Sequence, residues 1–283
     1  MRQSIGLKNQ VLKKEYSISN QRKLFHELKQ LLAYKEVFFA LTWKNIRLQY
    51  DSFWLGIVWG IFNPIIMSII FYVSFGKNIG TEYLNYFIFV YAGFLIWNFF
   101  SVSLSQSYTC FLNNSDLVKK VYFPRFLLPF SYLSSKLFDF IIGLFILLGI
   151  LLSSLEVYWL SFLIHTLLAF ICLVMTSSGF SLFFSVFTVR YKGFQAVFII
   201  FSQAIFFTSS VIYDSNKLIS KDMVQQLFQL NPLTGTMSIF RAGIYGEELS
   251  SMYYLLCILY SFVIFLVGLY WFHRENKYLV DRL

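Results

Sequence analysis

The feature that most constrains this chain is a series of six long runs without Asp, Glu, Lys or Arg. The runs cover residues 52–76, 83–115, 140–155, 157–189, 193–213 and 249–273. A helix needs about 20 mostly apolar residues to cross the hydrocarbon core of a bilayer, and five of the runs reach that length. The third reaches it only together with the stretch from Phe126, which contains Lys136 and Asp139. The sequence therefore predicts an all-α polytopic membrane protein with six transmembrane helices.

The composition of the chain excludes most other classes of protein. Charged residues make up 13% of the 283 residues, whereas soluble domains carry about 25%. A soluble enzyme of this size could not cover its surface with so few charges, and 58% apolar residues exclude a disordered chain. The cysteines, Cys110, Cys172 and Cys257, are far apart and belong to no Cys/His cluster, so we expect neither a disulfide framework nor a metal site.

The positions of the basic residues predict the orientation of the chain in the membrane. If the N-terminus is cytoplasmic, 18 Lys and Arg residues fall in inside segments and four in outside segments, with Lys136 left in the third span. Because cytoplasmic loops are enriched in Lys and Arg, we expect both termini to be cytoplasmic. No cleavable signal peptide is expected, since the first 23 residues contain no apolar core. The net charge of +9 is spread between the apolar runs, which argues against a nucleic-acid partner.

These patterns divide the chain into parts. Residues 1–50 are predicted to be a cytoplasmic tail and an amphipathic interface helix, because leucines at helical spacing in residues 24–32 share one side. Such a helix can anchor the chain on anionic lipid, offer a platform to a cytoplasmic partner, or do both. Residues 51–273 are the predicted transmembrane domain, and residues 274–283 a cytoplasmic C-terminus. The predicted spans are about 52–76, 83–107, 130–155, 158–187, 193–212 and 250–272.

The segment 214–246, before the last span, is predicted to form an outer gate. Its stretch 223–240 carries no charge, but several Gln residues, Asn231 and Pro232 make it too polar for a lipid-facing helix. Irregular backbone at membrane depth is tolerated only where protein or a water-filled cavity covers it. We therefore expect short re-entrant or interfacial helices here.

The chain lacks the motifs of an ATP-hydrolysing or metal-dependent enzyme. It contains no GxxxxGK[ST] phosphate-binding loop, no HExxH motif and no carboxylate pair within a span. The ionisable candidates inside the membrane are Lys136, Asp139 and His165, and we interpret His165 as an interfacial residue. The i, i+3 spacing lets Lys136 and Asp139 pair, either as a structural ion pair or along a polar path. We therefore expect no enzyme activity and no bound cofactor, and energy for transport from another subunit.

Aromatic residues make up 21% of the chain, and some of them are candidates for lining a channel. Sugar rings can lie against aromatic planes, so a passage for a long glycan would suit such side chains. The candidates are Tyr72, Tyr86, Tyr91, Phe94, Trp97 and Phe206. The alternative is that these residues face lipid or pack helices together. Pro64 removes one backbone hydrogen bond and predicts a kink in the first span, either for packing or beside a translocation path.

Three stretches carry a resemblance to a known family. Residues 43–64 read WKNIRLQYDSFWLGIVWGIFNP, residues 119–129 read KKVYFPRFLLP and are followed by Asp139, and residues 231–246 read NPLTGTMSIFRAGIYG. Over residues 30–275 the chain resembles the permease subunits of ABC exporters for bacterial cell-surface polysaccharides. The matching positions of the first stretch are Arg47, Tyr50, Ser52, Leu55, Gly56, Trp59 and Pro64. Arg190-Tyr191 stands where the family often has Arg-Asp, so no role is carried over to that position.

The resemblance implies an assembly and a cargo. Two permease copies would form a channel in the bacterial inner membrane, above two copies of a separate ATPase subunit that binds ATP and Mg. The cargo would be a lipid-linked glycan, with O-antigen as the first candidate and capsular polysaccharide and teichoic acid as alternatives. The N-terminal helix, about 22–45, and the loop 114–126 would face the ATPase. The implied coupling residues are Lys119, Lys120, Tyr122, Pro124 and Arg125, and the implied gate residues are Asn231, Pro232 and Arg241.

Other functions stay open at this point. A permease of similar architecture could carry a drug, haem or lipid, and the chain could also be a non-transporting membrane scaffold. A membrane-embedded glycosyltransferase is disfavoured because no acidic cluster is present. Lys119, Lys120 and Arg125 can also act simply as topology determinants, and both roles can coexist.

Overall fold

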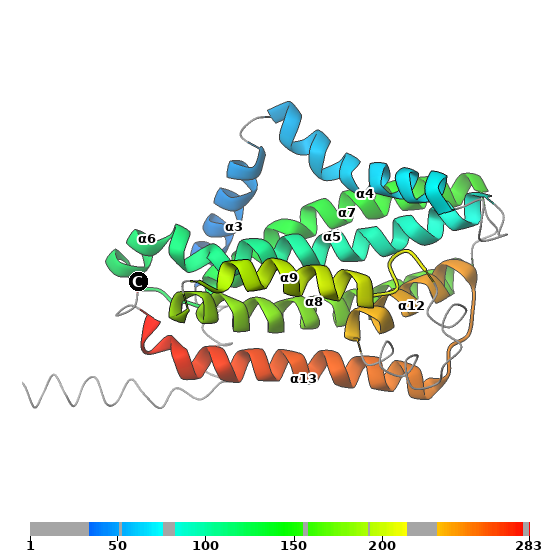
Figure 1. The fold of residues 1–283 in the computed structure, drawn as a ribbon. Coiled ribbons are helices and arrows are strands. Elements are labelled where there is room, and N and C mark those ends of the chain that lie inside the picture. Colours follow the sequence, from blue (N-terminus) through cyan, green and yellow to red (C-terminus); the bar gives the residue numbers. More distant parts are fainter. Residues whose placement is uncertain are drawn as a thin grey trace, which may run out of the picture.

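The computed structural model describes residues 34–50, 53–75, 83–154, 158–191, 193–213, 231–279 and 283. Every regular element within these ranges is a helix, which confirms the predicted fold class of an all-α polytopic membrane protein. The helices are α3 (Lys35–Tyr50), α4 (Phe53–Phe75), α5 (Tyr83–Asn113), α6 (Ser115–Lys120), α7 (Leu127–Ser154), α8 (Trp159–Arg190), α9 (Phe194–Thr208), α12 (Pro232–Tyr245) and α13 (Ser251–Asn276) (Figure 1).

Four of the described helices are long and apolar enough to cross a membrane. They cover Asn85–Asn113, Leu127–Ser153, Trp159–Arg190 and Ser251–Asn276. Helices α4 and α9 are apolar as well, and the longest continuous parts of them whose side chains the structure describes, Phe62–Phe75 and Val197–Thr208, are shorter. The number of six spans therefore stays a prediction. The start of the predicted interface helix, residues 22–33, and residues 214–230 of the predicted gate lie outside the described residues.

Helix α8 is the centre of the arrangement. It packs against α5, α7, α12 and α13, and the long helices run in roughly the same direction (Figure 1). Helix α3 crosses them steeply and lies against α7 and α4. The short helix α6 and the end of α13 lie at one end of the molecule, and α12 lies at the other. We call these the α6 end and the α12 end.

Two glycines bring the backbones of α8 and α13 into direct contact. A Cβ atom built on Gly268 would lie 2.1 Å from the main-chain oxygen of Gly179, and one on Gly179 would lie 2.5 Å from the main-chain oxygen of Ile264. Any larger residue at either position would force the helices apart. Small residues serve this purpose in membrane proteins, where close packing replaces the hydrophobic effect between helices.

Helix α9 is joined to its neighbours through aromatic rings. The ring of Phe184 on α8 lies 5.5 Å from that of Phe198 and 5.1 Å from that of Phe201. On α5, Tyr108 stacks on Phe198 at 4.3 Å. Rings at such distances attract each other beyond the effect of their buried area. Helix α9 is therefore held by contacts between rings, whereas α13 is held to α8 by direct contact of the two backbones.

Candidate functional site

The segment 115–126 at the α6 end presents one face to the surroundings and buries the other. We call this segment the docking loop. Lys119 and Lys120, in the last turn of α6, are exposed, and Tyr122 has 77% of its surface exposed. Phe123 and Phe126 are buried in a cluster with Phe111 and Phe272. The exposed side of the loop therefore rests on an aromatic anchor that fixes its position.

The five coupling residues predicted from the sequence do not share one environment. Lys119, Lys120 and Tyr122 are displayed on the surface, whereas Pro124 and Arg125 are half-buried. Arg125 donates from Nη1 to the main-chain oxygen of Asn276 and, at 3.2 Å, to its side-chain oxygen. Three of the residues can therefore meet a partner, and Arg125 fastens the loop to the end of α13.

One ion pair at this end was not predicted. Nη1 of Arg190, at the end of α8, lies 2.8 Å from Oε1 of Glu275 near the end of α13. The side chain of Glu275 is only 4% exposed, whereas that of Arg190 is 35% exposed. The sequence signal that points to this pair is Glu275 itself, a single acid in the last turn of an otherwise basic helix end.

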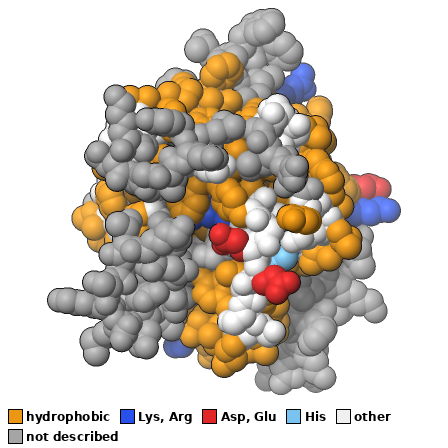
Figure 2. Space-filling model, turned by 90° about the vertical axis from the view of Figure 1, so that its right-hand side faces the viewer, with side chains coloured by type: hydrophobic (Ala, Val, Ile, Leu, Met, Phe, Trp, Pro, Cys, Tyr) orange, Lys and Arg blue, Asp and Glu red, His pale blue; other side chains and the backbone are white. Residues whose placement is uncertain are grey.

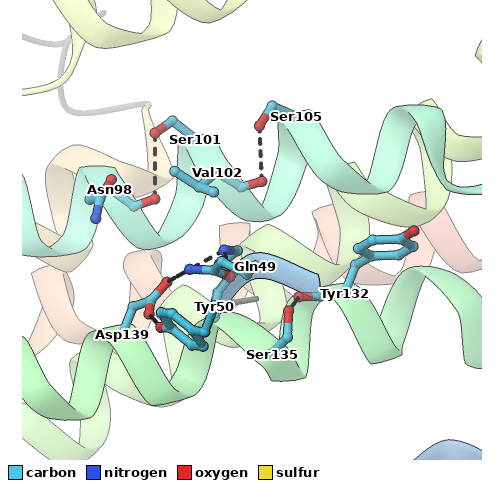
Figure 3. Close-up of polar contacts among 10 residues, drawn as sticks. Gln49, Tyr50, Asn98, Ser101, Val102, Ser105, Tyr132, Ser135 and Asp139 are labelled. Carbon is cyan, nitrogen blue, oxygen red and sulfur yellow. Dashed lines mark hydrogen bonds and ion pairs between the residues drawn. The ribbon is translucent and has the colours of Figure 1, made fainter. Parts of the chain in front are cut away.

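The last turn of α3 is joined to α7 by a polar cluster. Figure 3 shows Gln49, Tyr50 and Asp139 of this cluster, and Lys136 completes it. The predicted pair of Lys136 and Asp139 is confirmed, with 3.4 Å between Nζ and Oδ2. Gln49 donates to Oδ2 of Asp139 at 3.0 Å and accepts from Nζ of Lys136, and Tyr50 donates to Oδ1 of Asp139. We call this cluster the α3 latch.

The α3 latch joins two of the stretches that carried the family resemblance, since Tyr50 belongs to the first and Asp139 follows the second. Burial, followed by the hydrogen bond to Asp139, raises the pKa of Tyr50 above its usual value, so the phenol stays protonated and donates. Two more contacts extend the attachment of α3. Asn45 donates to Ser131 at 3.1 Å, and Lys44 donates to Asn114 at 3.0 Å.

A small cleft lies beside the α3 latch. Its lining is formed by Pro64, Leu95, Asn98, Phe99, Val102, Lys136, Asp139, Phe140 and Gly143. Its volume is about 10 Å³, which is close to the space that one water molecule needs. In the single chain Lys136 and Asp139 therefore do not line a wide path. Pro64 lies inside α4 and is buried against this cleft.

At the α12 end, the sequence fixes both limits of α12. Asn231 is the N-cap and accepts from the main-chain nitrogen of Leu233 at 3.0 Å, and Pro232 occupies the first turn, where its missing N–H is harmless. Asn231 also donates to Thr208 and Ser209 at the end of α9. Gly246 ends the helix with φ of 68°, a left-handed conformation that favours glycine.

Arg241 is the most firmly held of the predicted gate residues. Its guanidinium donates to the main-chain oxygens of Phe89, Ser210 and Val211 at 2.6–3.2 Å. It also lies over the ring of Phe89, 3.4 Å from the centroid. Gly93 leaves the space for it, because a Cβ atom there would lie 2.5 Å from Nη2 of Arg241. Arg241 therefore ties α12 to α5 and to the segment after α9.

Comparison with known proteins places the chain in a family. The family described as ABC-2 type transporter matches residues 36–245. The chain belongs to the ABC-2 type transporter family. Its curated relatives include two O-antigen export system permease proteins RfbA from Klebsiella pneumoniae, 24% and 23% identical, each over 83% of this chain and 90% of the relative. A third, from Myxococcus xanthus, is 23% identical over 78% of this chain and 85% of the relative.

Members of the ABC-2 family are membrane subunits of transporters and are not ATPases themselves, so this chain is a multi-pass transport subunit. Within the single subunit, the six predicted channel residues are packed rather than open. Tyr86 donates to the main-chain oxygen of Ile212 at 3.2 Å, and Tyr91 to that of Gly143 at 3.0 Å. The other four, Tyr72, Phe94, Trp97 and Phe206, are partly or fully buried against the same core. Lining a channel stays a prediction for all six.

Proposed function

We propose that this chain is the channel-forming permease subunit of an ATP-driven exporter that moves a lipid-linked polysaccharide across the bacterial inner membrane. O-antigen is the cargo that the similarity to the three relatives favours. The observation that carries the proposal is the docking loop, which displays Lys119, Lys120 and Tyr122 on an aromatic anchor. A transport subunit without an ATP-binding motif needs such a surface to receive work from a separate ATPase. Two copies of this chain would assemble with two copies of that ATPase.

The charges at the two ends support the expected orientation. Exposed or half-exposed basic residues at the α6 end are Lys119, Lys120, Arg190, Arg274 and Lys277. At the α12 end Glu247 and Glu248 are exposed, and Figure 2 shows acidic side chains among hydrophobic ones near the centre of this face. Because basic residues favour the cytoplasmic side, the α6 end and both termini are cytoplasmic in this proposal.

The first test is a deletion strain scored for surface glycan and for lipid-linked glycan inside the cell. We expect the glycan to disappear from the surface and to accumulate inside, and a plasmid carrying the wild-type chain to restore export. The sugar composition of the retained polymer identifies the cargo. Normal surface glycan in a host without a second exporter contradicts the proposal and favours a drug, haem or lipid permease, or a scaffold.

The second test addresses the docking loop. The variant Lys119→Glu/Lys120→Glu should still reach the membrane. Less ATPase subunit should copurify with it, because two exposed positive charges become negative. Lys277→Glu is the control, since it makes one Lys→Glu change at an exposed position of the same end. Normal export by the double variant would remove the coupling role from these lysines.

A further inference from the structure

Two arginines from separate segments converge on the last turn of α13. Arg125 of the docking loop donates to the main chain and side chain of Asn276, and Arg190 at the end of α8 pairs with Glu275 at 2.8 Å. Glu275 and Asn276 are neighbours in sequence, so a single turn receives both contacts. We call Glu275 and Asn276 the α13 seat.

The environment of Glu275 favours a partner of opposite charge at this position. Its carboxylate is 4% exposed, and a buried charge is unfavourable unless a partner of opposite charge compensates it. Around the pair, Phe272 stacks on Phe111 at 6.2 Å, and Leu279 is buried with the anchor residue Phe123. The docking loop, the end of α8 and the α13 seat therefore form one packed unit.

The same unit continues to the opposite end of the molecule. Helices α8 and α13 touch at Gly179 and Gly268, and α12 packs on both. A Cβ atom on Gly235 of α12 would lie 3.0 Å from the sulfur of Cys257, and one on Gly243 would lie 2.7 Å from Cβ of His165. Close-packed contacts of this kind transmit displacement, because the interior cannot be compressed.

We propose that the α13 seat is the place through which movement of the docking loop reaches the unit of α8, α13 and α12, with Arg190 and Glu275 as positioning residues. When the docking loop moves, the bonds from Arg125 to Asn276 move the end of α13 with it. The ion pair between Glu275 and Arg190 then moves the end of α8 in the same direction. Without the ion pair, the docking loop moves the end of α13 relative to α8, and the movement does not reach α8. The inference rests on the proposed function and adds two residues, Arg190 and Glu275, that lie outside the docking loop.

The test exchanges the charges of Arg190 and Glu275 and measures whether the exchange restores export that the single variants lose. Arg190→Glu and Glu275→Gln should each lower surface glycan by about tenfold, which lies within the usual range of coupling between two sites. Both variants should still reach the membrane, bind the ATPase subunit and hydrolyse ATP as purified complexes. The double variant Arg190→Glu/Glu275→Arg should recover at least about half of the export, because it restores a pair of opposite charges.

The control is Arg274→Glu, which reverses an exposed charge in the same turn and should export normally. Normal export by both single variants would overturn the inference and leave the proposed function intact. Loss of membrane abundance in parallel with loss of export, with no rescue by the swap, would also overturn it, because the pair would then only stabilise the fold. The deletion strain belongs in the same series: if it keeps its surface glycan, the proposed function fails, and this inference fails with it.

Discussion

The two ends of the molecule are both held by arginine, but with different partners. At the α12 end Arg241 is 6% exposed and donates to main-chain oxygens of α5 and of residues 210–211. At the α6 end Arg190 is 35% exposed and pairs with a side chain. A main-chain oxygen cannot change its charge or turn away, so the contact at the α12 end is fixed by the fold. A side-chain partner at a half-exposed site can be exchanged, which suits the end that we propose to contact the ATPase subunit.

The comparison predicts that the largest loss of stability follows from the arginine at the α12 end. Arg241→Met keeps much of the volume but leaves three main-chain acceptors without this donor, which we expect to destabilise the protein by at least about 4 kcal/mol. The measurement is thermal unfolding of the purified protein in detergent, together with its abundance in the membrane. Arg274→Met, an exposed arginine on α13, is the control and should unfold like the wild type. A wild-type unfolding temperature for Arg241→Met would mean that the contacts of Arg241 are not what holds α12.

The second prediction concerns the α3 latch, where the partners are again side chains. Asp139→Asn keeps the shape but leaves the charge of Lys136, which is 3% exposed, without its counter-ion. We expect a loss of about 2–3 kcal/mol, less than at Arg241 because Gln49 still contacts the lysine. Limited proteolysis after α3 should also become faster, since the bonds from Gln49 and Tyr50 that attach the helix to Asp139 of α7 are weakened. Asp116→Asn, an exposed acid of α6, should change neither property.

The sequence could predict the local features that these comparisons use, but not the contacts between distant segments. Charge-free runs located the long helices, and the i, i+3 spacing found the pair of Lys136 and Asp139. The pair of Arg190 and Glu275 joins residues that are 85 apart in sequence, so no periodicity reports it. The spacing of residues in the sequence does not identify the main-chain acceptors of Arg241 either, because every residue carries a carbonyl group.

The docking loop shows the same limit within a few residues. Lys119, Lys120 and Arg125 are all basic residues of one loop, and the sequence offered them one common role. Only the packing of Phe123 and Phe126 separates the displayed lysines from the arginine that faces α13. The direction of a side chain in an irregular segment depends on what the neighbouring helices bury, which is a property of the whole fold.

The smallest effect on stability is expected at the displayed face of the docking loop, and it sharpens the distinction between anchor and surface. Tyr122→Ala removes a side chain that is 77% exposed and should change the free energy of unfolding by less than about 0.5 kcal/mol. Recovery of the ATPase subunit with the purified protein should nevertheless fall, because an exposed aromatic side chain suits the centre of a protein interface. Tyr270→Ala, on an exposed face of α13, tests whether any exposed tyrosine gives this result, and it should leave recovery unchanged. If Tyr122→Ala lowers the unfolding temperature as much as Asp139→Asn does, then the displayed face is part of the anchor, and the two roles within the loop are not separate.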